Sequence, residues 1–262
     1  MAGSPNNSSP VVLTIAGFDP SGGAGIIADV QTILHFGCRP VAAITSLTFQ
    51  NTEGVFGAIH ESAQSVRAQI LPVIEESQVA GVKIGMLPTA EIVLEIARMI
   101  RAHTLPPPVI DPVMRSSSGF ELVEQDAIEA LRSQLMPLAR LITPNVPEAE
   151  ALTGITIEDE QGMRSAAEKL REMGARAVLI KGGHLNQKSE VGSQKSEGRQ
   201  AIDILEDEGD VTVFRSEWID TLPVRGTGCM MSSAIASNLA RGNSLPESVR
   251  VAKQFVADAI RG

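Results

Sequence analysis

The sequence predicts an α/β fold in which a mostly parallel sheet lies between two layers of helices. Short apolar runs alternate regularly with helical patterns along most of the 262 residues, as in a chain built from strand–helix–strand units. The runs are apolar throughout, which is typical of parallel strands that are covered on both faces. Glycines or polar residues directly follow several runs. Because ligands bind beyond the carboxyl ends of such strands, those residues are the first candidates for function.

The first half of the chain supplies most of the expected sheet. Apolar runs predict strands at residues 11–16, 41–47, 79–86 and 108–113, and helical periodicity predicts helices at 26–34, 66–74 and 92–100. Gly22, Gly23 and Gly25 mark the loop between the first strand and the first helix. A further short strand is expected at residues 55–60, outside the main sheet.

The second half continues the alternation and then changes character. Residues 127–135 and 166–173 are expected to be helical, and residues 141–143 and 177–180 to be strands. The polar segment 186–200, which contains a duplicated Gln-Lys-Ser-Glu piece, is typical of a surface loop. A small antiparallel hairpin at 202–205 and 211–214 and two helices at 230–240 and 249–260 follow. Residues 1–10 are expected to be a disordered lead-in, and residues 11–262 a single domain, because no linker divides them.

Composition excludes several classes of partner. The net charge of −9 and the aromatic content of 3% argue against a nucleic-acid partner, which needs a basic footprint or stacking rings. No apolar run is long enough to span a membrane, and the N-terminus lacks the features of a signal peptide. Cys38 and Cys229 set no disulfide framework, so a cytoplasmic protein is expected.

The most informative motif is Gly226-Thr227-Gly228-Cys229, at the start of an apolar helical pattern. Glycines let backbone N–H groups converge, and the helix N-terminus adds partial positive charge, so the motif predicts an anion cradle. Cys229 would lie in the first turn, where the pKa of a thiol is typically lowered. A phosphate-sized cradle beside a thiolate indicates phosphoryl transfer, although a structural glycine loop with a buried cysteine explains these four residues equally well.

Carboxylates and a lysine are expected at the same edge of the sheet. Asp111 follows an apolar strand and can hold a divalent cation, or simply form a turn before proline. Asn145 and Glu148 stand at a helix start, where Glu148 can position hydrated Mg²⁺ or the two residues can cap the helix. Lys181 ends a predicted strand and can neutralise phosphate charge, or be merely solvated.

Two further polar residues can meet a heteroaromatic ring. Asp29 lies in the first predicted helix and Gln50 follows a strand, and both can hydrogen-bond a ring that carries amine and nitrogen groups. Taken alone, each is more often an ordinary surface or capping residue.

Taken together, these segments resemble the ribokinase-like superfamily and, more closely, the hydroxymethylpyrimidine/phosphomethylpyrimidine kinases of thiamine biosynthesis. The resemblance runs from about residue 11 to the end and rests on seven ordered blocks, which cover residues 14–25, 50–52, 83–87, 111–114, 143–149, 181–184 and 226–229. It implies a three-layer α/β/α domain, ATP and Mg²⁺ as cofactors, a pyrimidine as substrate and a homodimer.

The resemblance also implies a role for each candidate residue. Cys229 would be the base that activates the substrate hydroxymethyl group, and the N–H groups of 226–229 would form the anion hole. Asp111, Asn145 and Glu148 would serve Mg²⁺ and the phosphates, and Lys181 the nucleotide. The aminopyrimidine pocket would be formed by Asp29, Gln50, Gly17, Met86 and Val113.

Departures from the family pattern leave the substrate open. Arg225 stands where relatives often have His, Arg115 to Gly119 replace a stretch that often contains Lys, and Phe18 replaces Ser. An arginine before the cradle can stabilise transferred phosphate or bind the phosphate of a monophosphate substrate. Pyridoxal kinases of the Cys type share the cradle, so pyridoxal is the second candidate substrate. A non-catalytic pyrimidine or nucleotide sensor is a third reading, and a thiol redox protein a fourth.

Overall fold

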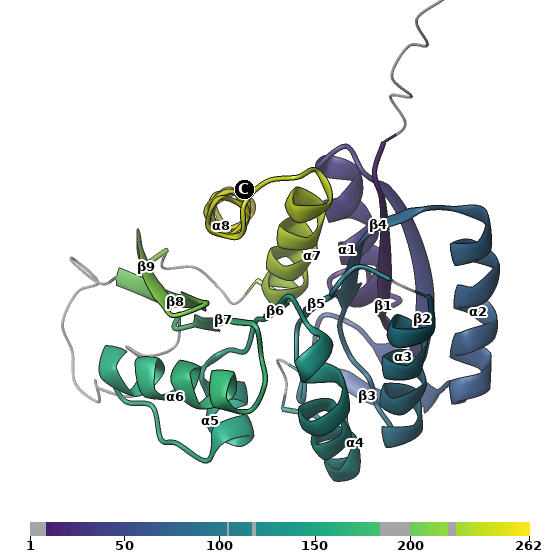
Figure 1. Ribbon diagram of the computed structural model, residues 1–262, viewed down its shortest axis with the longest axis horizontal. Helices are drawn as coiled ribbons and strands as arrows, with labels where there is room; N and C mark the ends of the chain where they lie inside the picture. Colours follow the sequence, from purple (N-terminus) through teal and green to yellow (C-terminus); the bar gives the residue numbers. More distant parts are fainter. Residues whose placement is uncertain (1–8, 104, 117–118, 184–199, 220–223) are drawn as a thin grey trace, which may run out of the picture.

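The computed structural model describes residues 9–103, 105–116, 119–183, 200–219 and 224–262, which form a sheet between two helical layers (Figure 1). The strands are β1 (Val11–Phe18), β2 (Arg39–Gln50), β3 (Val55–His60), β4 (Val79–Ile84), β5 (Val109–Ile110), β6 (Leu141–Ile142), β7 (Ala177–Lys181), β8 (Gln200–Asp207) and β9 (Asp210–Glu217). They lie in the order β3-β2-β1-β4-β5-β6-β7-β8-β9. The six from β2 to β7 run parallel, so their carboxyl ends share one edge.

Both ends of the sheet are antiparallel. At one end β3 pairs with β2, with Leu47 opposite Ile59, so the strand expected outside the main sheet is in fact its edge strand. Sequence periodicity could not show this, because pairing depends on residues that follow a turn. At the other end β8 and β9 form the expected hairpin, and β8 continues the sheet from β7.

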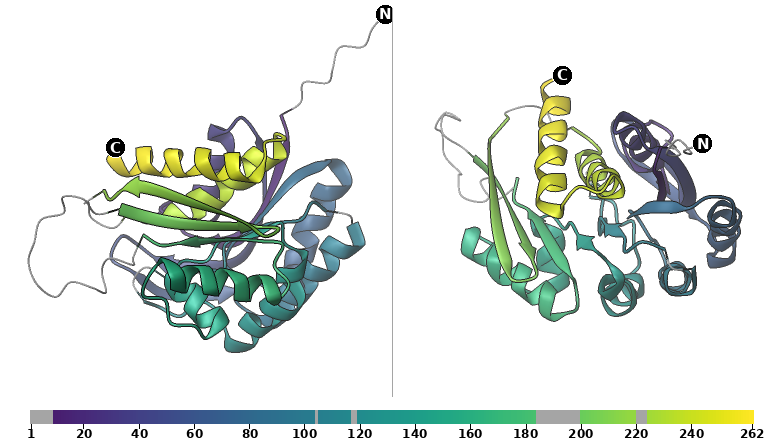
Figure 2. Two further views of the ribbon diagram at one scale, coloured as in Figure 1. Left: turned by 60° about the vertical axis from the view of Figure 1, so that its left-hand side comes forward. Right: turned by 45° about the horizontal axis from the view of Figure 1, so that its top comes forward.

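Helices cover the sheet on both faces. On one face lie α1 (Gly25–His35), α7 (Thr227–Ala240) and α8 (Leu245–Arg261); on the other lie α2 (Ala63–Glu76), α3 (Ala90–His103), α4 (Gln125–Ala130), α5 (Val146–Thr153) and α6 (Glu160–Glu172). A π-helical turn at Leu131–Leu135 continues α4. Figure 2 shows α8 beside the β8–β9 hairpin, where Lys253 forms an ion pair with Asp203.

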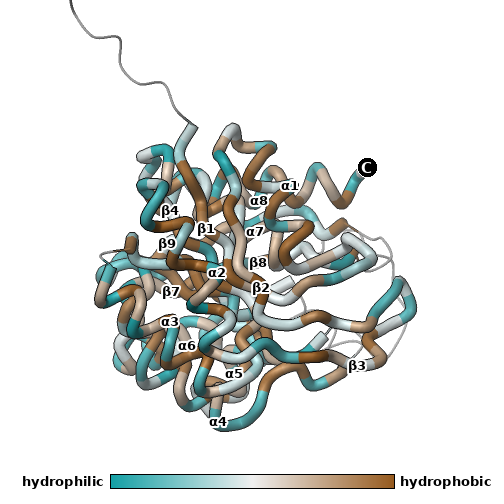
Figure 3. The backbone as a smooth tube through the Cα atoms, turned by 90° about the vertical axis from the view of Figure 1, so that its right-hand side faces the viewer, coloured by the Kyte–Doolittle hydropathy of each residue, from teal (hydrophilic) through white to brown (hydrophobic). Residues whose placement is uncertain are grey.

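Alternate side chains of each buried strand enter two hydrophobic cores. In β1, Leu13 and Ile15 pack under α2 to α6, whereas Val12 packs under α1, α7 and α8. The hydropathy colouring of Figure 3 shows β1 as a hydrophobic segment inside the molecule. The continuous apolar runs in the sequence are therefore explained, as expected, by strands that are buried on both faces.

Some predictions cannot be compared with the structure. The lead-in at residues 1–8 and nearly all of the polar loop, residues 184–199, lie outside the described residues. Among the helices that are described, none is long and apolar enough to cross a membrane.

Candidate active site

The carboxyl edge of the sheet brings Asp111 and Lys181 into contact. Asp111 directly follows β5 and Lys181 ends β7, two strands away in the sheet. Lys181 Nζ donates a hydrogen bond to Asp111 Oδ1 over 2.8 Å, and Thr143 Oγ1 lies 3.3 Å from the same oxygen. Burial disfavours the charged form of Lys181, but the carboxylates of Asp111 and Glu148 raise the pKa of Lys181 above its usual value. The expected convergence of strand-end residues is therefore present.

Asn145 and Glu148 form a capping box at the start of α5. Asn145 Oδ1 accepts from the Glu148 N–H at 2.9 Å, and Glu148 Oε2 accepts from the Asn145 N–H at 2.8 Å. Burial and the charge of Asp111 raise the pKa of Glu148 to about 7, while Lys181 acts in the opposite direction. The capping reading of these residues is correct, and Glu148 also belongs to the electrostatic group of Asp111 and Lys181.

The cradle at the start of α7 requires glycine at two positions. Gly226 has φ +75°, and a Cβ there would lie 2.1 Å from the Gly23 carbonyl oxygen. A Cβ on Gly228 would lie 3.2 Å from both Asp111 Oδ2 and Lys181 Nζ. The N-terminus of α7 is therefore placed directly against the Asp111–Lys181 pair, with its N–H groups available to an anion.

Cys229 is the third residue of α7, and its thiol is not activated in the free protein. Burial raises the pKa of Cys229 to about 11; the Lys83 ammonium lowers it, but Asp29 and Asp111 raise it. The low pKa expected from the position of Cys229 in the helix is therefore wrong for this state. Burial is the largest influence on this pKa, and sequence alone does not show how deeply a side chain is buried.

Asp29 does not lie where a ligand ring can meet it. Its side chain is completely buried, and its carboxylate accepts hydrogen bonds from Thr14, Lys83 and Ser233 at 2.6, 2.8 and 2.8 Å. These three donors come from β1, β4 and α7, so the carboxylate is enclosed by protein. The geometry argues against the ring contact that the sequence suggested for Asp29.

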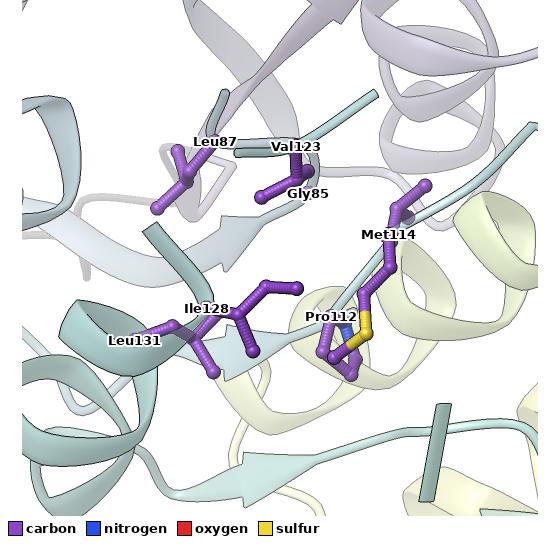
Figure 4. A pocket seen from close by; sticks show the side chains of 8 residues that line it. Gly85, Leu87, Pro112, Met114, Val123, Ile128 and Leu131 are labelled. Carbon is purple, nitrogen blue, oxygen red and sulfur yellow. The ribbon is translucent and has the colours of Figure 1, made fainter. Parts of the chain in front are cut away.

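The other expected ring contacts lie around the ends of β1, β4 and β5. A Cβ on Gly17 would lie 3.4 Å from the sulfur of Met86, so these two residues are neighbours. Val113 lines a small apolar pocket together with Gly85, Leu87, Pro112, Met114, Val123, Ile128 and Leu131 (Figure 4). Apolar walls of this kind suit the faces of a heteroaromatic ring.

Gln50 belongs to a polar cluster around the buried Asp19. Burial alone would raise the pKa of Asp19. Hydrogen bonds from Ser21 and Gln50 and the charge of Arg225 outweigh it and lower this pKa below its usual value. Arg225 Nη2 donates to Asp19 Oδ2 at 3.1 Å, and its Nη1 donates to the Asn51 carbonyl oxygen at 2.5 Å. Arg225 therefore connects the start of the cradle to the loop after β1 and to the turn after β2.

Sequence reasoning expected Asp19 and Lys83 among the polar clusters at the strand ends, but it gave neither residue a role of its own. Asp19 directly follows β1, which is a signal for a ligand-edge position. Lys83 lies inside the apolar strand β4 and is completely buried. A charged residue in such a strand is itself a signal, because lysine is almost never fully buried without a partner.

The donor set fits a magnesium ion that keeps most of its ligands from water and phosphate. Among the described residues, no three His, Cys, Asp or Glu side chains gather as a metal site. Asp111 and Glu148 nevertheless act on each other electrostatically beside Lys181. Mg²⁺ is usually bound through one or two carboxylates plus phosphate oxygens, so these two residues suffice.

Comparisons with known proteins agree with this geometry. A hydroxymethylpyrimidine/phosphomethylpyrimidine kinase of Aquifex aeolicus is 40% identical over 251 residues, which cover 96% of this chain and 94% of that protein. The crystal structure of a phosphomethylpyrimidine kinase from Clostridium difficile is 39% identical, with a TM-score of 0.81, and covers 96% of this chain and 100% of its own. An ADP complex of Bacillus subtilis pyridoxal kinase is 35% identical, with a TM-score of 0.82 over 95% of this chain and 90% of its own.

The fold is thus that of the pyridoxal and phosphomethylpyrimidine kinases, with the ribokinase-like arrangement of helices on both faces of one sheet. The sequence model of one family, described as phosphomethylpyrimidine kinase, matches residues 19–262, which include the whole cradle. The chain belongs to the phosphomethylpyrimidine kinase family of phosphotransferases.

Proposed function

We propose that this protein uses ATP and Mg²⁺ to phosphorylate 4-amino-5-hydroxymethyl-2-methylpyrimidine and then its monophosphate, giving the diphosphate for thiamine biosynthesis. The observation that carries the proposal is the placement of the α7 N-terminus against the Asp111–Lys181 pair. An anion cradle beside a cation and a carboxylate is what transfer of a phosphoryl group requires. Membership of the family and the ADP complex of the Bacillus relative support ATP as the donor.

Cys229 is the base in this proposal. Its thiolate accepts the proton of the substrate hydroxyl, the substrate oxygen bonds to the γ-phosphorus, and the bond from that phosphorus to the bridging oxygen of ADP breaks. The backbone N–H groups of Gly226, Thr227, Gly228 and Cys229 hold the transferred group. Because the pKa of Cys229 is about 11 in the free protein, turnover should rise with pH across the neutral range.

The remaining polar residues bind and orient the phosphates. Lys181 neutralises charge on the nucleotide, and Asn145 fixes the start of α5 beside it. Asp111 and Glu148 would hold Mg²⁺, which supplies charge neutralisation at the phosphates when bound. In the substrate pocket, Gly17, Met86 and Val113 would contact the ring, with Gln50 as its hydrogen-bonding partner.

Replacing Glu148 should separate its role in turnover from its role in stability. A glutamine preserves the capping box but removes the charge, so Glu148→Gln should lower kcat/KM about 10- to 100-fold. The pKa of Glu148 is raised to about 7, so above pH 7 the folded free protein holds an unfavourable carboxylate. Urea unfolding at pH 8 should therefore show Glu148→Gln to be about 1–3 kcal/mol more stable than the parent. The exposed Glu91→Gln is the control, and equal effects of both variants would contradict the assignment.

The second candidate substrate is pyridoxal. The similarity to the Bacillus subtilis pyridoxal kinase favours it, and the cradle with Cys229 suits either hydroxymethyl group. ADP release with Mg-ATP, measured with the pyrimidine, its monophosphate and pyridoxal at matched concentrations, decides between them. Turnover of both pyrimidines well above pyridoxal supports the thiamine-pathway proposal. Turnover of pyridoxal alone would assign that substrate instead. If folded protein releases no ADP with any of the three compounds, the non-catalytic sensor becomes the favoured function.

The homodimer is supported by an apolar face on the β2–β3 edge. Leu47, Phe49 and Ile59 point to one face of these paired strands and are 39%, 50% and 57% exposed. Figure 3 shows β3 at the periphery of the molecule. A second copy covering this face should give a molar mass in solution of twice the 27.7 kDa of one chain, and Phe49→Ser should weaken that association. A mass of one chain at all concentrations would contradict it.

The cytoplasm is the proposed compartment. Cys38 and Cys229 are both free thiols, and a base that works as a thiolate needs reducing surroundings.

A further inference from the structure

A nearly buried ion pair, which the proposed mechanism does not use, lies beside the strand that carries Lys181. Lys253 of α8 pairs with Asp203 Oδ2 of β8, and their side chains are only 13% and 7% exposed. Figure 2 shows α8 next to the β8–β9 hairpin. Buried ion pairs are a weak source of stability, because desolvation of the two charges offsets their attraction. The surroundings of Asp203 indicate a further role.

Asp203 lies directly opposite Lys181 in the sheet. The antiparallel register of β7 and β8 ends with these two residues facing each other. The next residue, Gly182, is buried, and its N–H donates a hydrogen bond to Asp203 Oδ1 over 3.0 Å. A buried backbone N–H needs an acceptor, and here a side chain supplies it. The carboxylate therefore extends the contact between the two strands by one residue beyond β7.

The end of β7 is held from both sides. On the side of β6, the Lys181 N–H donates to the Pro144 carbonyl oxygen at 2.9 Å. On the side of β8, Asp203 accepts from Gly182. Glycine has more backbone freedom than any other residue, so the direction in which the chain leaves the sheet depends on such contacts. From this fixed end, Lys181 Nζ reaches Asp111 Oδ1 at 2.8 Å.

We propose that Asp203 is a positioning residue for the nucleotide site. Its Oδ1 fixes the end of β7 through Gly182, its Oδ2 is anchored by Lys253, and Lys181 is thereby held where it meets the phosphates of a nucleoside triphosphate. The inference deepens the proposed function and rests on Lys181 as the cation that binds the nucleotide.

Positioning and simple charge effects predict opposite results for this carboxylate. A negative charge near the nucleotide repels its phosphates, so by Coulomb's law alone the loss of Asp203 should tighten nucleotide binding. If Asp203 instead holds the end of β7, its loss should weaken nucleotide binding, because Lys181 is no longer fixed. The sign of the change therefore distinguishes the two.

Isothermal titration calorimetry with AMP-PCP and Mg²⁺, in the absence of pyrimidine, tests the proposal. Asp203→Ala removes the acceptor of the Gly182 N–H, and the dissociation constant of AMP-PCP should rise about tenfold, the effect of one hydrogen bond to a charged group. Asp203→Asn keeps an acceptor oxygen and should stay within about threefold of the parent. In steady-state assays of Asp203→Ala, KM for ATP should rise with the dissociation constant, while KM for the pyrimidine stays within about twofold.

Asp207→Ala is the matched control on the same strand. Asp207 lies at the other end of β8, opposite Ala177 at the start of β7. Its carboxylate also pairs with a basic side chain, since Arg140 donates to both of its oxygens at 2.8 Å. Asp207→Ala should therefore lower the unfolding temperature, as Asp203→Ala does, but leave the dissociation constant of AMP-PCP unchanged.

A double variant keeps the test decisive if Asp203→Ala fails to fold. Asp203→Ala with Lys253→Met leaves no lone buried charge and preserves the net charge, so it should fold. It still lacks the acceptor for Gly182, and its dissociation constant for AMP-PCP should also rise about tenfold. Asp207→Ala with Arg140→Met is its control and should bind AMP-PCP as the parent does.

Unchanged or tighter binding of AMP-PCP by Asp203→Ala and by the double variant would overturn the proposal. Equal weakening in Asp207→Ala would also overturn it, because the effect would then be a general loss of stability. Failure of the proposed function is a separate result. If the parent phosphorylates no pyrimidine, but Asp203→Ala weakens its binding of AMP-PCP, the proposed substrate is rejected and the positioning role of Asp203 stands.

Discussion

Replacing Cys229 with alanine should lower kcat for the pyrimidine by about 10²- to 10⁴-fold, the usual contribution of a positioned general base. The thiol is the titratable group at the start of α7, and the cradle formed by the backbone remains in the variant. The dissociation constants of ATP and of the pyrimidine should therefore stay within about twofold of the parent. Steady-state ADP release and isothermal titration calorimetry measure the two quantities.

Cys38→Ala is the matched control for this substitution. Cys38 is the other cysteine, and it is buried in the core formed by α1, α7 and α8. Its removal should change stability slightly and leave kcat unchanged. If Cys229→Ala retained full turnover, another group would have to act as the base.

Replacing Gly226 with alanine should strongly lower turnover by displacing the cradle. The residue has φ +75°, and the added Cβ would lie 2.1 Å from the Gly23 carbonyl oxygen, so the backbone of one segment must move. We expect kcat/KM to fall at least about 10²-fold, because a shift of 1 Å in positioning has an effect of that size. Thermal unfolding and ADP release measure the change.

Gly37→Ala is the control that separates the effect of the steric clash with Gly23 from the effect of backbone strain. Gly37 also has positive φ, at +70°, but nothing lies within 4 Å of its Cβ position. It should lose about 1 kcal/mol of stability, in line with a left-handed non-glycine residue, and keep full turnover. Equal kinetic behaviour of Gly226→Ala and Gly37→Ala would show that the cradle needs no close approach of backbone.

The sequence predicted the parallel part of the fold because each strand and helix there has its own periodicity. It could not predict the pairing of β3 with β2, which depends on a bulged antiparallel register between Phe49 and Gln50. The start of α5 was visible in Asn145 and Glu148, but its length was not, since the apolar pattern of this helix is short.

The position of a residue at the end of a strand correctly predicted membership of the site. The burial of individual side chains could not be predicted from the sequence. Asp111 and Lys181 each follow or end a strand, and the sheet order brings them together. Asp29 of helix α1 also looked like a ligand contact, but its partner Lys83 lies 54 residues away on strand β4. A lysine in an apolar strand indicates that it has a buried partner, but not which residue that partner is. The same limitation explains Cys229, whose pKa depends on burial by segments that are distant in sequence.

The most direct test of the account is a crystal structure of the protein with hydroxymethylpyrimidine and a non-hydrolysable ATP analogue. We expect the hydroxymethyl oxygen within hydrogen-bond distance of Cys229 Sγ, and the γ-phosphate on the N–H groups of Gly226 to Cys229 beside Lys181. A ring bound with its hydroxymethyl group turned away from Cys229, or a γ-phosphate held outside the cradle, would contradict the central claim.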